Sequence, residues 1–362
     1  MWNLTSSQGV LGYLSNTPFA ATSVQRLVGG FNAFTYRVKL LTPLEDGSTT
    51  LIVKHYEGYV AFAAEIKLES VRSDFEYDAL VTLWDCGLVN NETIVRAPRP
   101  IHYDRDTHTI FISDLGSDVV NLSTMFDEHL QRACNDSDRM EIENMAFDIG
   151  SALGDFLGRL HTWGTSTKHQ KPFLHHHRRE RIFALFSNLT ARSANNLGVK
   201  EGWLESMLSA EMRKVSVENQ VLAMGDLSLN NILVHRVPDR SNLRIYVVDW
   251  ELFRPACREL DLGEITGTWL SFAHYRRINV DFPFLPSLYK AYQEHHKVDR
   301  TRIAILSGMF TMGLGTTASW VRDGGDEIYK QTALVGYEVM KLAHEGEDRI
   351  TSAGSPLKML FD

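Results

Sequence analysis

The alternation of hydrophobic and polar positions changes character part-way along the chain. In the first part, apolar residues alternate on both sides of a Gly-Gly pair at 23–41, which predicts a strand, a turn and a second strand. The apolar runs at 51–56 and 109–117 predict two further strands. Apolar residues at helical spacing predict a short helix within 1–22 and a longer one within 61–87.

The rest of the chain has mainly helical spacing. A long helix is predicted at 140–164, and helical patterns continue almost to the end of the sequence. Only two stretches in this part resemble strands, VLAMGDLSLNNILV at 221–234 and LRIYVVDWEL at 243–252. We therefore expect an α+β fold with two lobes, a small one with an antiparallel sheet at 1–115 and a large helical one at 116–362.

Composition narrows the classes of partner. The chain has 362 residues, of which 44% are hydrophobic and 23% charged, and its formal net charge is -8. This charge argues against nucleic acid or an anionic membrane as a partner, and no obligate protein partner is expected. The N-terminus has no basic region followed by an apolar core, and no apolar run is long enough to span a bilayer. We expect a cytoplasmic protein.

Two polar residues interrupt the apolar stretch at 221–234, and they allow two interpretations. Asp226 and Asn231 could be the turn residues of a hairpin. They could instead lie on a loop beside a sheet, where a carboxylate accepts or orients the proton of an attacking hydroxyl. A carboxamide oxygen such as that of Asn231 can coordinate Mg²⁺, and Asp249, at the end of another apolar run, could supply a second hard oxygen.

The first part of the chain carries candidates for a phosphate site. A glycine-rich turn between strands lets backbone N–H groups approach phosphate oxygens, although Gly-Gly hairpins are also common without this role. That turn consists of Gly29, Gly30, Phe31 and Asn32. Lys54 lies within an apolar strand, so its side chain either faces solvent or points at an anion in a cleft. Glu76, near the edge of a helical apolar face, could hold that lysine in place.

Taken together, these elements match the parts of a kinase-type phosphoryl transferase in their order and approximate spacing. The chain resembles the aminoglycoside phosphotransferase/choline kinase group of small-molecule kinases, which have a protein-kinase-like fold. The segments that carry the resemblance are LVGGFNAFTYRV, LIVK, FEYDAL, FISDLG, LGDFLGRLH, MGDLSLNNILV, VVDWEL and ELDLGEI. Fungal kinases of 4-hydroxytryptamine are the nearest branch by this resemblance, and methylthioribose kinases are a more distant one.

The resemblance implies ATP and Mg²⁺ as cofactors and assigns roles to particular residues. Asp226 would be the catalytic aspartate, and Asn231 and Asp249 would be the Mg²⁺ ligands. Lys54, tied by Glu76, would hold the ATP phosphates together with the glycine-rich turn. A hinge that meets adenine through its backbone would consist of Ser113, Asp114 and Leu115. Most of the group has a histidine where this chain has Met224, which puts the fine geometry of the loop in question.

The acceptor is expected to be small. Asp261 follows Asp249 by only twelve residues, which leaves no room for the long activation segment of a protein kinase. A hydroxylated indole amine is the leading candidate, and a sugar such as methylthioribose or an amino alcohol is the alternative. The residues that could contact the acceptor are Glu251 and Asp323, for a cationic amine, and Trp250 and Trp320, which are more often core residues.

Two questions stay open at this level. The histidine run at 175–177 could be a solvated basic segment or part of a site. A nucleotide-binding pseudokinase is the alternative to an enzyme. Because Lys54, Asp226 and Asp249 are all present, the sequence favours the enzyme.

Overall fold

The computed structural model describes residues 2–28, 32–174, 179–237, 239–279 and 281–361, without the side chains of 179–182 and 216. The expected phosphate-contacting residues Gly29, Gly30 and Phe31 and the histidine run at 175–177 lie outside this part of the chain.

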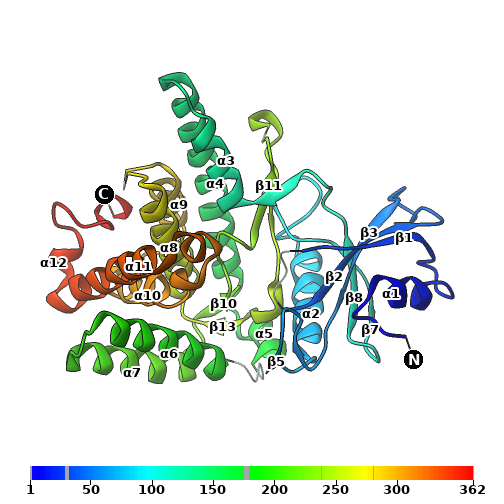
Figure 1. The fold of residues 1–362 in the computed structure, drawn as a ribbon, viewed down its shortest axis with the longest axis horizontal. Helices are drawn as coiled ribbons and strands as arrows, with labels where there is room; N and C mark the ends of the chain where they lie inside the picture. Colours follow the sequence, from blue (N-terminus) through cyan, green and yellow to red (C-terminus); the bar gives the residue numbers. More distant parts are fainter. Residues whose placement is uncertain (1, 29–31, 175–178, 238, 280, 362) are drawn as a thin grey trace. The chain divides into compact units, whose positions relative to one another are not determined.

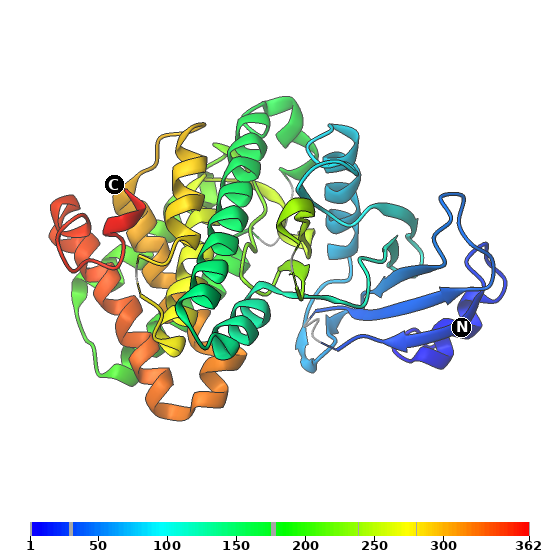
Figure 2. The ribbon, with the colours of Figure 1, turned by 90° about the horizontal axis from the view of Figure 1, so that it is seen from above.

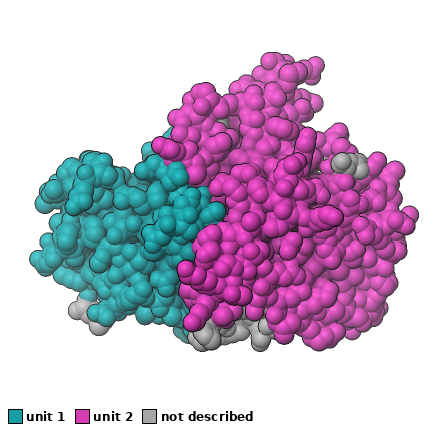
Figure 3. Space-filling model, turned by 180° about the vertical axis from the view of Figure 1, so that it is seen from behind, with its two compact units in different colours: residues 1–91, 97–119, 248–251 teal, residues 92–96, 120–247, 252–362 magenta. Residues whose placement is uncertain are grey.

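The chain forms two compact units, coloured separately in Figure 3. The first contains residues 1–91, 97–119 and 248–251, and the second contains 92–96, 120–247 and 252–362. Two short segments, 92–96 and 248–251, therefore belong to a different unit from the residues that flank them in the sequence. The division into lobes at 1–115 and 116–362 stays a prediction.

An antiparallel sheet of five strands in the order β1-β2-β3-β8-β7 forms the framework of the first unit (Figure 1). Its strands are β1 (Ala21–Arg26), β2 (Phe34–Leu40), β3 (Thr50–His55), β7 (Pro100–Asp104) and β8 (Thr109–Ser113). The helix α1 (Ser7–Leu14) packs its buried Val10 and Leu14 in one cluster with Leu51 and Val53 of β3. Because side chains alternate along a strand, Lys54 points to the opposite face of the sheet from Leu51 and Val53.

The helix predicted within 61–87 is only partly correct. Its second half is α2 (Arg72–Asp85), which buries Ala79, Leu80 and Leu83 as the spacing indicated. Its first half is instead a strand, β5 (Ala63–Lys67), paired in a short hairpin with β4 (Tyr59–Val60). Four of the five residues of β5 are exposed, so its pairing rather than an apolar pattern defines it.

Packed helices make up most of the second unit. Its principal helices are α3 (Leu122–Arg132), α4 (Asp136–Trp163), α6 (Arg179–Leu197), α7 (Gly202–Val217), α8 (Glu259–Arg276), α9 (Phe284–Gln293), α10 (Arg300–Met312) and α11 (Ser319–Glu345). The shorter helices are α5 (Thr167–Gln170) and α12 (Glu347–Ile350). Helix α4 confirms the predicted long helix and lies beside α9, as Figure 2 shows. In the described ranges, no helix is long and apolar enough to cross a membrane.

The two strands on either side of Asp226 belong to different sheets. Strand β10 (Val221–Ala223) pairs with β13 (Arg254–Ala256), whereas β11 (Ile232–His235) pairs with β12 (Ile245–Val247). The second pair belongs to a sheet of order β6-β12-β11-β9, whose outer strands are β6 (Val95–Arg96) and β9 (Val119–Asn121). The hairpin interpretation is therefore wrong, and the segment from 224 to 231 is a loop between two sheets.

The expectation of only two strand-like stretches in this part of the chain is also wrong, because β13 and β9 (Val119–Asn121) are strands as well. Each has three residues, too short for an alternation to show in the sequence. In the first part of the sequence, the short strand β6 (Val95–Arg96) pairs in parallel with β12. The predicted α+β class, with an antiparallel sheet first and helices after it, is confirmed.

Candidate active site

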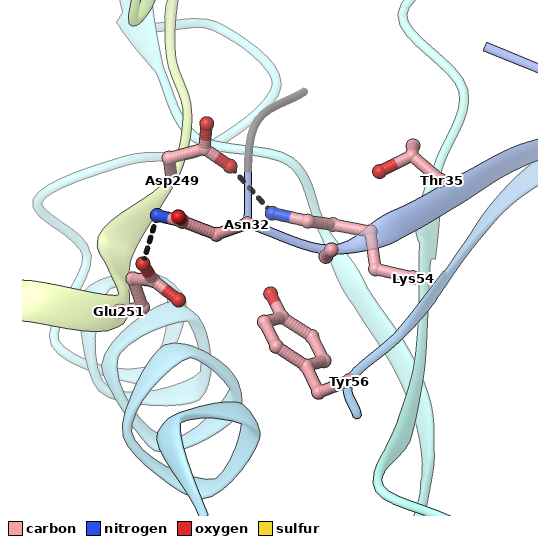
Figure 4. A pocket seen from close by; sticks show the side chains of 7 residues that line it. Asn32, Thr35, Lys54, Tyr56, Asp249 and Glu251 are labelled. Carbon is pink, nitrogen blue, oxygen red and sulfur yellow. Dashed lines mark hydrogen bonds and ion pairs between the residues drawn. The ribbon is translucent and has the colours of Figure 1, made fainter. Parts of the chain in front are cut away.

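Lys54 is buried between two carboxylates of the first unit. Its Nζ donates to Glu76 Oε1 and Oε2 at 2.7 and 2.9 Å and to Asp249 Oδ1 at 2.5 Å. Lys54 is 7% exposed and Glu76 is 2% exposed. The alternative in which this lysine faces solvent is therefore wrong. Figure 4 shows Lys54 reaching from β3 toward Asp249, in a small pocket also lined by Asn32, Thr35 and Tyr56.

The charges of this cluster stabilise the protonated lysine. Burial alone would lower the pKa of Lys54, but the adjacent Asp249 and Glu76 carboxylates more than offset this effect and raise it. Burial raises the pKa of Glu76 to about 7, although Lys54 acts in the opposite direction. The Tyr56 hydroxyl also donates to Glu76. A cation held this way has a fixed position from which it can attract an anion.

Asp249 lies in the short turn between β12 and the 3₁₀ helix Trp250–Leu252. Its φ of 63° is in the left-handed region, which is uncommon for a residue other than glycine and costs conformational energy. Its side chain is 37% exposed, in contrast to the buried Lys54 and Glu76. The turn thus presents a partly solvated carboxylate beside a buried cation.

Asn32, the last residue of the glycine-rich turn, is bonded to Glu251. Asn32 Nδ2 donates to Glu251 Oε1 at 2.6 Å (Figure 4), and the buried Arg72 donates from Nη2 to the Asn32 carbonyl at 2.7 Å. Arg72 Nε also lies 3.4 Å from Glu251 Oε2. Glu251 is thus buried in a network of the first unit, and its neighbour Trp250 is fully buried. These positions favour structural roles over the expected contacts with an acceptor.

The expected hinge begins at Ser113, the last residue of β8. The Arg37 guanidinium donates to both carboxylate oxygens of Asp114, at 2.8 and 3.0 Å, and to the Gly116 carbonyl at 2.6 Å. The Ser113 N–H donates to the Arg99 carbonyl at 2.9 Å. Since the Ser113 amide is occupied, a donor for adenine would have to come from the backbone of Asp114 or Leu115.

The loop that carries Asp226 is held by a buried carboxylate of the second unit. Asp261 accepts the backbone N–H groups of Met224 and Gly225 at 2.9 and 2.8 Å, and its Oδ2 lies 3.1 Å from His161 Nε2. Gly225 has a φ of 79°, and a Cβ there would lie 2.2 Å from Arg254 Nη1. Only glycine fits this position. Through these bonds Asp261 supports the loop that carries Asp226.

Asp226 and Asn231 are both partly exposed and are joined through the backbone. Asn231 Nδ2 donates to the Asp226 carbonyl at 2.9 Å, and the Ser228 N–H donates to the same carbonyl at 3.1 Å. These bonds fix the orientation of the Asn231 carboxamide. With the nitrogen engaged, the carboxamide oxygen is the atom that can serve as a ligand to a hard cation.

Comparison with known proteins decides the family. The model of the phosphotransferase enzyme family matches residues 23–306, well over half of the chain. The chain belongs to the phosphotransferase enzyme family. The resemblance inferred from the sequence motifs is thereby confirmed.

Several relatives agree with this membership. The 4-hydroxytryptamine kinase of Psilocybe cyanescens is 26% identical over 358 residues, 95% of this chain and 94% of the relative. Phosphotransferase FrzJ of Cladobotryum sp is 26% identical over 336 residues, 86% of this chain and 85% of the relative.

Two solved structures match nearly the whole fold. The choline kinase of Cryptosporidium parvum has a TM-score of 0.52 at 13% identity and covers 98% of this chain and 99% of its own. A choline/ethanolamine kinase family protein of Mesorhizobium loti has a TM-score of 0.51 at 14% identity and covers 99% of both chains. The expected kinase-like fold is confirmed.

One buried carboxylate beside the loop that carries Asp226 was not among the predicted site residues. Glu264 of α8 is 0% exposed, and its Oε2 accepts the Leu227 N–H at 3.0 Å. In the sequence it lies in ELDLGEI, where Glu259 and Asp261 are also acidic, so its charge alone did not single it out. The available signal was its position three residues after Asp261, which places both carboxylates on one face of the helix.

The two remaining acceptor candidates lie in the second unit. Trp320 is buried, donates from Nε1 to Ser271 Oγ at 3.0 Å and packs edge-on against Phe272. It is therefore part of the core. Asp323 is exposed on α11.

Proposed function

We propose that this phosphotransferase transfers a phosphoryl group from ATP to a hydroxyl of a small metabolite. The observation that carries the proposal is the buried Lys54 between Glu76 and Asp249. A cation with a fixed position is suited to the α and β phosphates of a nucleotide, since phosphoryl transfer depends on positioning and charge neutralisation.

The residues present fit a Mg²⁺ ion that arrives with the nucleotide. Asp249 and Asn231 offer hard oxygen atoms, the type that Mg²⁺ prefers. Among the residues that the structure describes, no group of three or more His, Cys, Asp or Glu could hold a metal ion. We propose that Asp249 and Asn231 supply only part of the coordination, which suits an ion that is otherwise bound by phosphate oxygens and water. When bound, Mg²⁺ would neutralise charge on the phosphates.

Asp226 is the proposed catalytic group. It is partly exposed on a loop whose backbone is fixed by Asp261. A carboxylate there can accept a hydrogen bond from the acceptor hydroxyl, orient it toward the phosphorus and take its proton as the bond forms.

For the acceptor we propose a hydroxylated indole amine, with 4-hydroxytryptamine as the first compound to test. The support is the similarity to a 4-hydroxytryptamine kinase along almost the whole chain. The net charge of -8 would also favour the approach of a cationic amine. The short segment between Asp249 and Asp261 agrees with a small acceptor.

The test is steady-state kinetics with 4-hydroxytryptamine and methylthioribose side by side, at saturating ATP and Mg²⁺. We expect phosphorylation of the amine with a kcat/KM at least about tenfold higher than that for the sugar, in keeping with the loss expected when polar recognition is mismatched. As controls, Lys54→Met should abolish the activity, whereas Lys39→Met, at an exposed position of β2, should not change it.

Each other outcome contradicts a different part of the proposal. Preferential turnover of methylthioribose would show that the acceptor is the sugar and not the amine. Binding of ATP without phosphorylation of either compound, or of choline or an aminoglycoside, would favour a pseudokinase. Equal activity of the Lys54→Met variant and the parent would show that Lys54 is not part of the phosphate site.

A further inference from the structure

A second carboxyl group lies beside Asp226, buried inside the second unit. Glu264 is in hydrogen-bonding reach of the Asp226 side chain. Its Oε2 accepts the Leu227 N–H, but its Oε1 is buried and meets no N–H or O–H donor in the described ranges. Two ionised carboxylates in this position would repel each other, with one oxygen deprived of both water and a donor.

The charged groups around Glu264 disfavour a second negative charge beside that of Asp226. Asp261 lies on the same helix and Arg254 on β13, and these two have opposite effects on its ionisation. His161 of α4 reaches the cluster only through Asp261. Burial and the neighbouring Asp226 raise the pKa of Glu264 well above its usual range, while Arg254 acts in the opposite direction.

Of the helices packed against α8, α10 carries the buried Arg302, which lies near Glu259 at the start of α8. Helix α10 meets the α8 glycines with Leu306, Ser307, Phe310 and Thr311, and α11 meets the end of α8 with Trp320. From α9, the titratable Tyr289 contacts Thr266 and the Leu262 carbonyl. Arg254 is thus the cation that faces Glu264 among the groups described here, against two carboxylates.

We propose that Glu264 is a positioning residue that stays protonated and donates a hydrogen bond to Asp226. This inference rests on the proposed catalytic role of Asp226. The proton is shared and is not consumed in the reaction. The neutral carboxyl satisfies both of its oxygens, because Oε2 accepts from Leu227 and the hydroxyl at Oε1 donates to Asp226. The bond keeps Asp226 ionised and fixes the direction of the oxygen that receives the acceptor hydroxyl.

The matched substitutions are Glu264→Gln and Glu264→Leu. Glutamine keeps one acceptor for the Leu227 N–H and one donor for Asp226, as the protonated acid does, whereas leucine keeps the volume and removes both. We expect the glutamine variant to retain kcat within about fivefold. The leucine variant should lose about 10- to 100-fold in kcat, with the KM for ATP within about twofold, because a hydrogen bond to a charged group is removed.

The pH profile separates positioning from mere packing. A donor to the ionised form lowers the pKa of a carboxyl group, so its loss should raise the pKa of Asp226. The acidic limb of kcat/KM should therefore move up by about one pH unit in Glu264→Leu and stay in place in Glu264→Gln. Glu259→Leu, at another buried acid of α8, is the matched control and should leave the limb unchanged. An unshifted limb in Glu264→Leu, or an equal loss in both Glu264 variants, would overturn the proposal.

A second measurement does not depend on catalysis. A carboxyl group that is protonated in the folded state binds a proton that the unfolded chain releases above its ordinary pKa. Folding therefore weakens as pH rises above that ordinary value, by up to tenfold in the equilibrium constant per pH unit. Urea unfolding at several pH values should show this dependence in the parent and a correspondingly smaller one in Glu264→Gln.

The unfolding data also separate the two proposals. Parallel pH dependences of the parent and Glu264→Gln would show that Glu264 is ionised in the folded state, and the inference would be wrong. A clear difference between the pH dependences of the parent and Glu264→Gln would support a protonated Glu264. If an Asp226→Asn variant were then fully active, Glu264 would still be protonated, but Asp226 would not be the catalytic residue.

Discussion

Asp226 is the residue at which the proposed chemistry can be tested most directly. Asp226→Asn keeps the size of the side chain but removes the group that accepts the proton of the acceptor hydroxyl. We expect turnover to fall on the order of 100-fold or more, with the Kd for ATP within about twofold, because the side chain acts on the acceptor and not on the nucleotide. Steady-state kinetics and calorimetry give the two quantities.

The control for this substitution is Asp281→Asn, at an exposed position of the same unit. It should behave like the parent in both measurements. An Asp226→Asn variant with activity within a few-fold of the parent would remove Asp226 from the proposed role.

Met224 shows how backbone contacts can stand in for a side chain. Most of the group has a histidine at this position, which raised a doubt about the loop. In this chain the Met224 side chain is buried, and its backbone N–H donates to Asp261 together with that of Gly225. The support of the loop therefore comes from a carboxylate of α8, and it does not require a polar side chain at 224.

At the level of elements, the contact between α4 and α9 depends on small residues. A Cβ added at Gly154 would lie 2.1 Å from the Leu288 carbonyl oxygen. We therefore expect Gly154→Ala to lower the free energy of unfolding by roughly 1–3 kcal/mol, because the backbone of α9 has to move. Urea denaturation with far-UV circular dichroism measures this change.

Gly202→Ala is the matched control, because a Cβ at this position of α7 would meet no atom within 4 Å. Its free energy of unfolding should stay within about 0.5 kcal/mol of the parent. Equal free energies of unfolding for Gly154→Ala and Gly202→Ala would mean that the backbones of α4 and α9 can move apart without loss of stability.

For the whole molecule, the cofactor proposal predicts stabilisation that requires both ATP and Mg²⁺. At a ligand concentration of about 100 times Kd, binding adds about 2.7 kcal/mol to the folded state, which should raise Tm by several degrees. EDTA should remove most of this shift. Asp249→Ala should abolish it, since a hard anionic oxygen that fits Mg²⁺ is removed.

The comparison for that experiment is Asp281→Ala, which should keep the full shift in Tm. Isothermal titration calorimetry gives the affinity directly. An unchanged affinity of Asp249→Ala for Mg-ATP would contradict its assignment as a metal ligand.

The sequence by itself determined the features that depend on short-range patterns. Alternation along strands and helical spacing indicated most of the first sheet and the long α4. The combination of a strand lysine, a helix glutamate and three polar residues near strand ends indicated a phosphotransferase, because that chemistry requires these residue types in a fixed order. The family match agrees with this interpretation.

The tertiary structure decided which of these residues meet. Lys54 and Asp249 are 195 positions apart, and no local pattern specifies their 2.5 Å contact. The pairing of β10 with β13 and of β11 with β12 likewise excludes a hairpin at Asp226 that the sequence allowed. Glu264 is one of three acidic residues at 259–264, and only the tertiary structure places it against the loop that carries Asp226. Strand pairing and the burial of charge are non-local, so they follow from the packing of the whole chain.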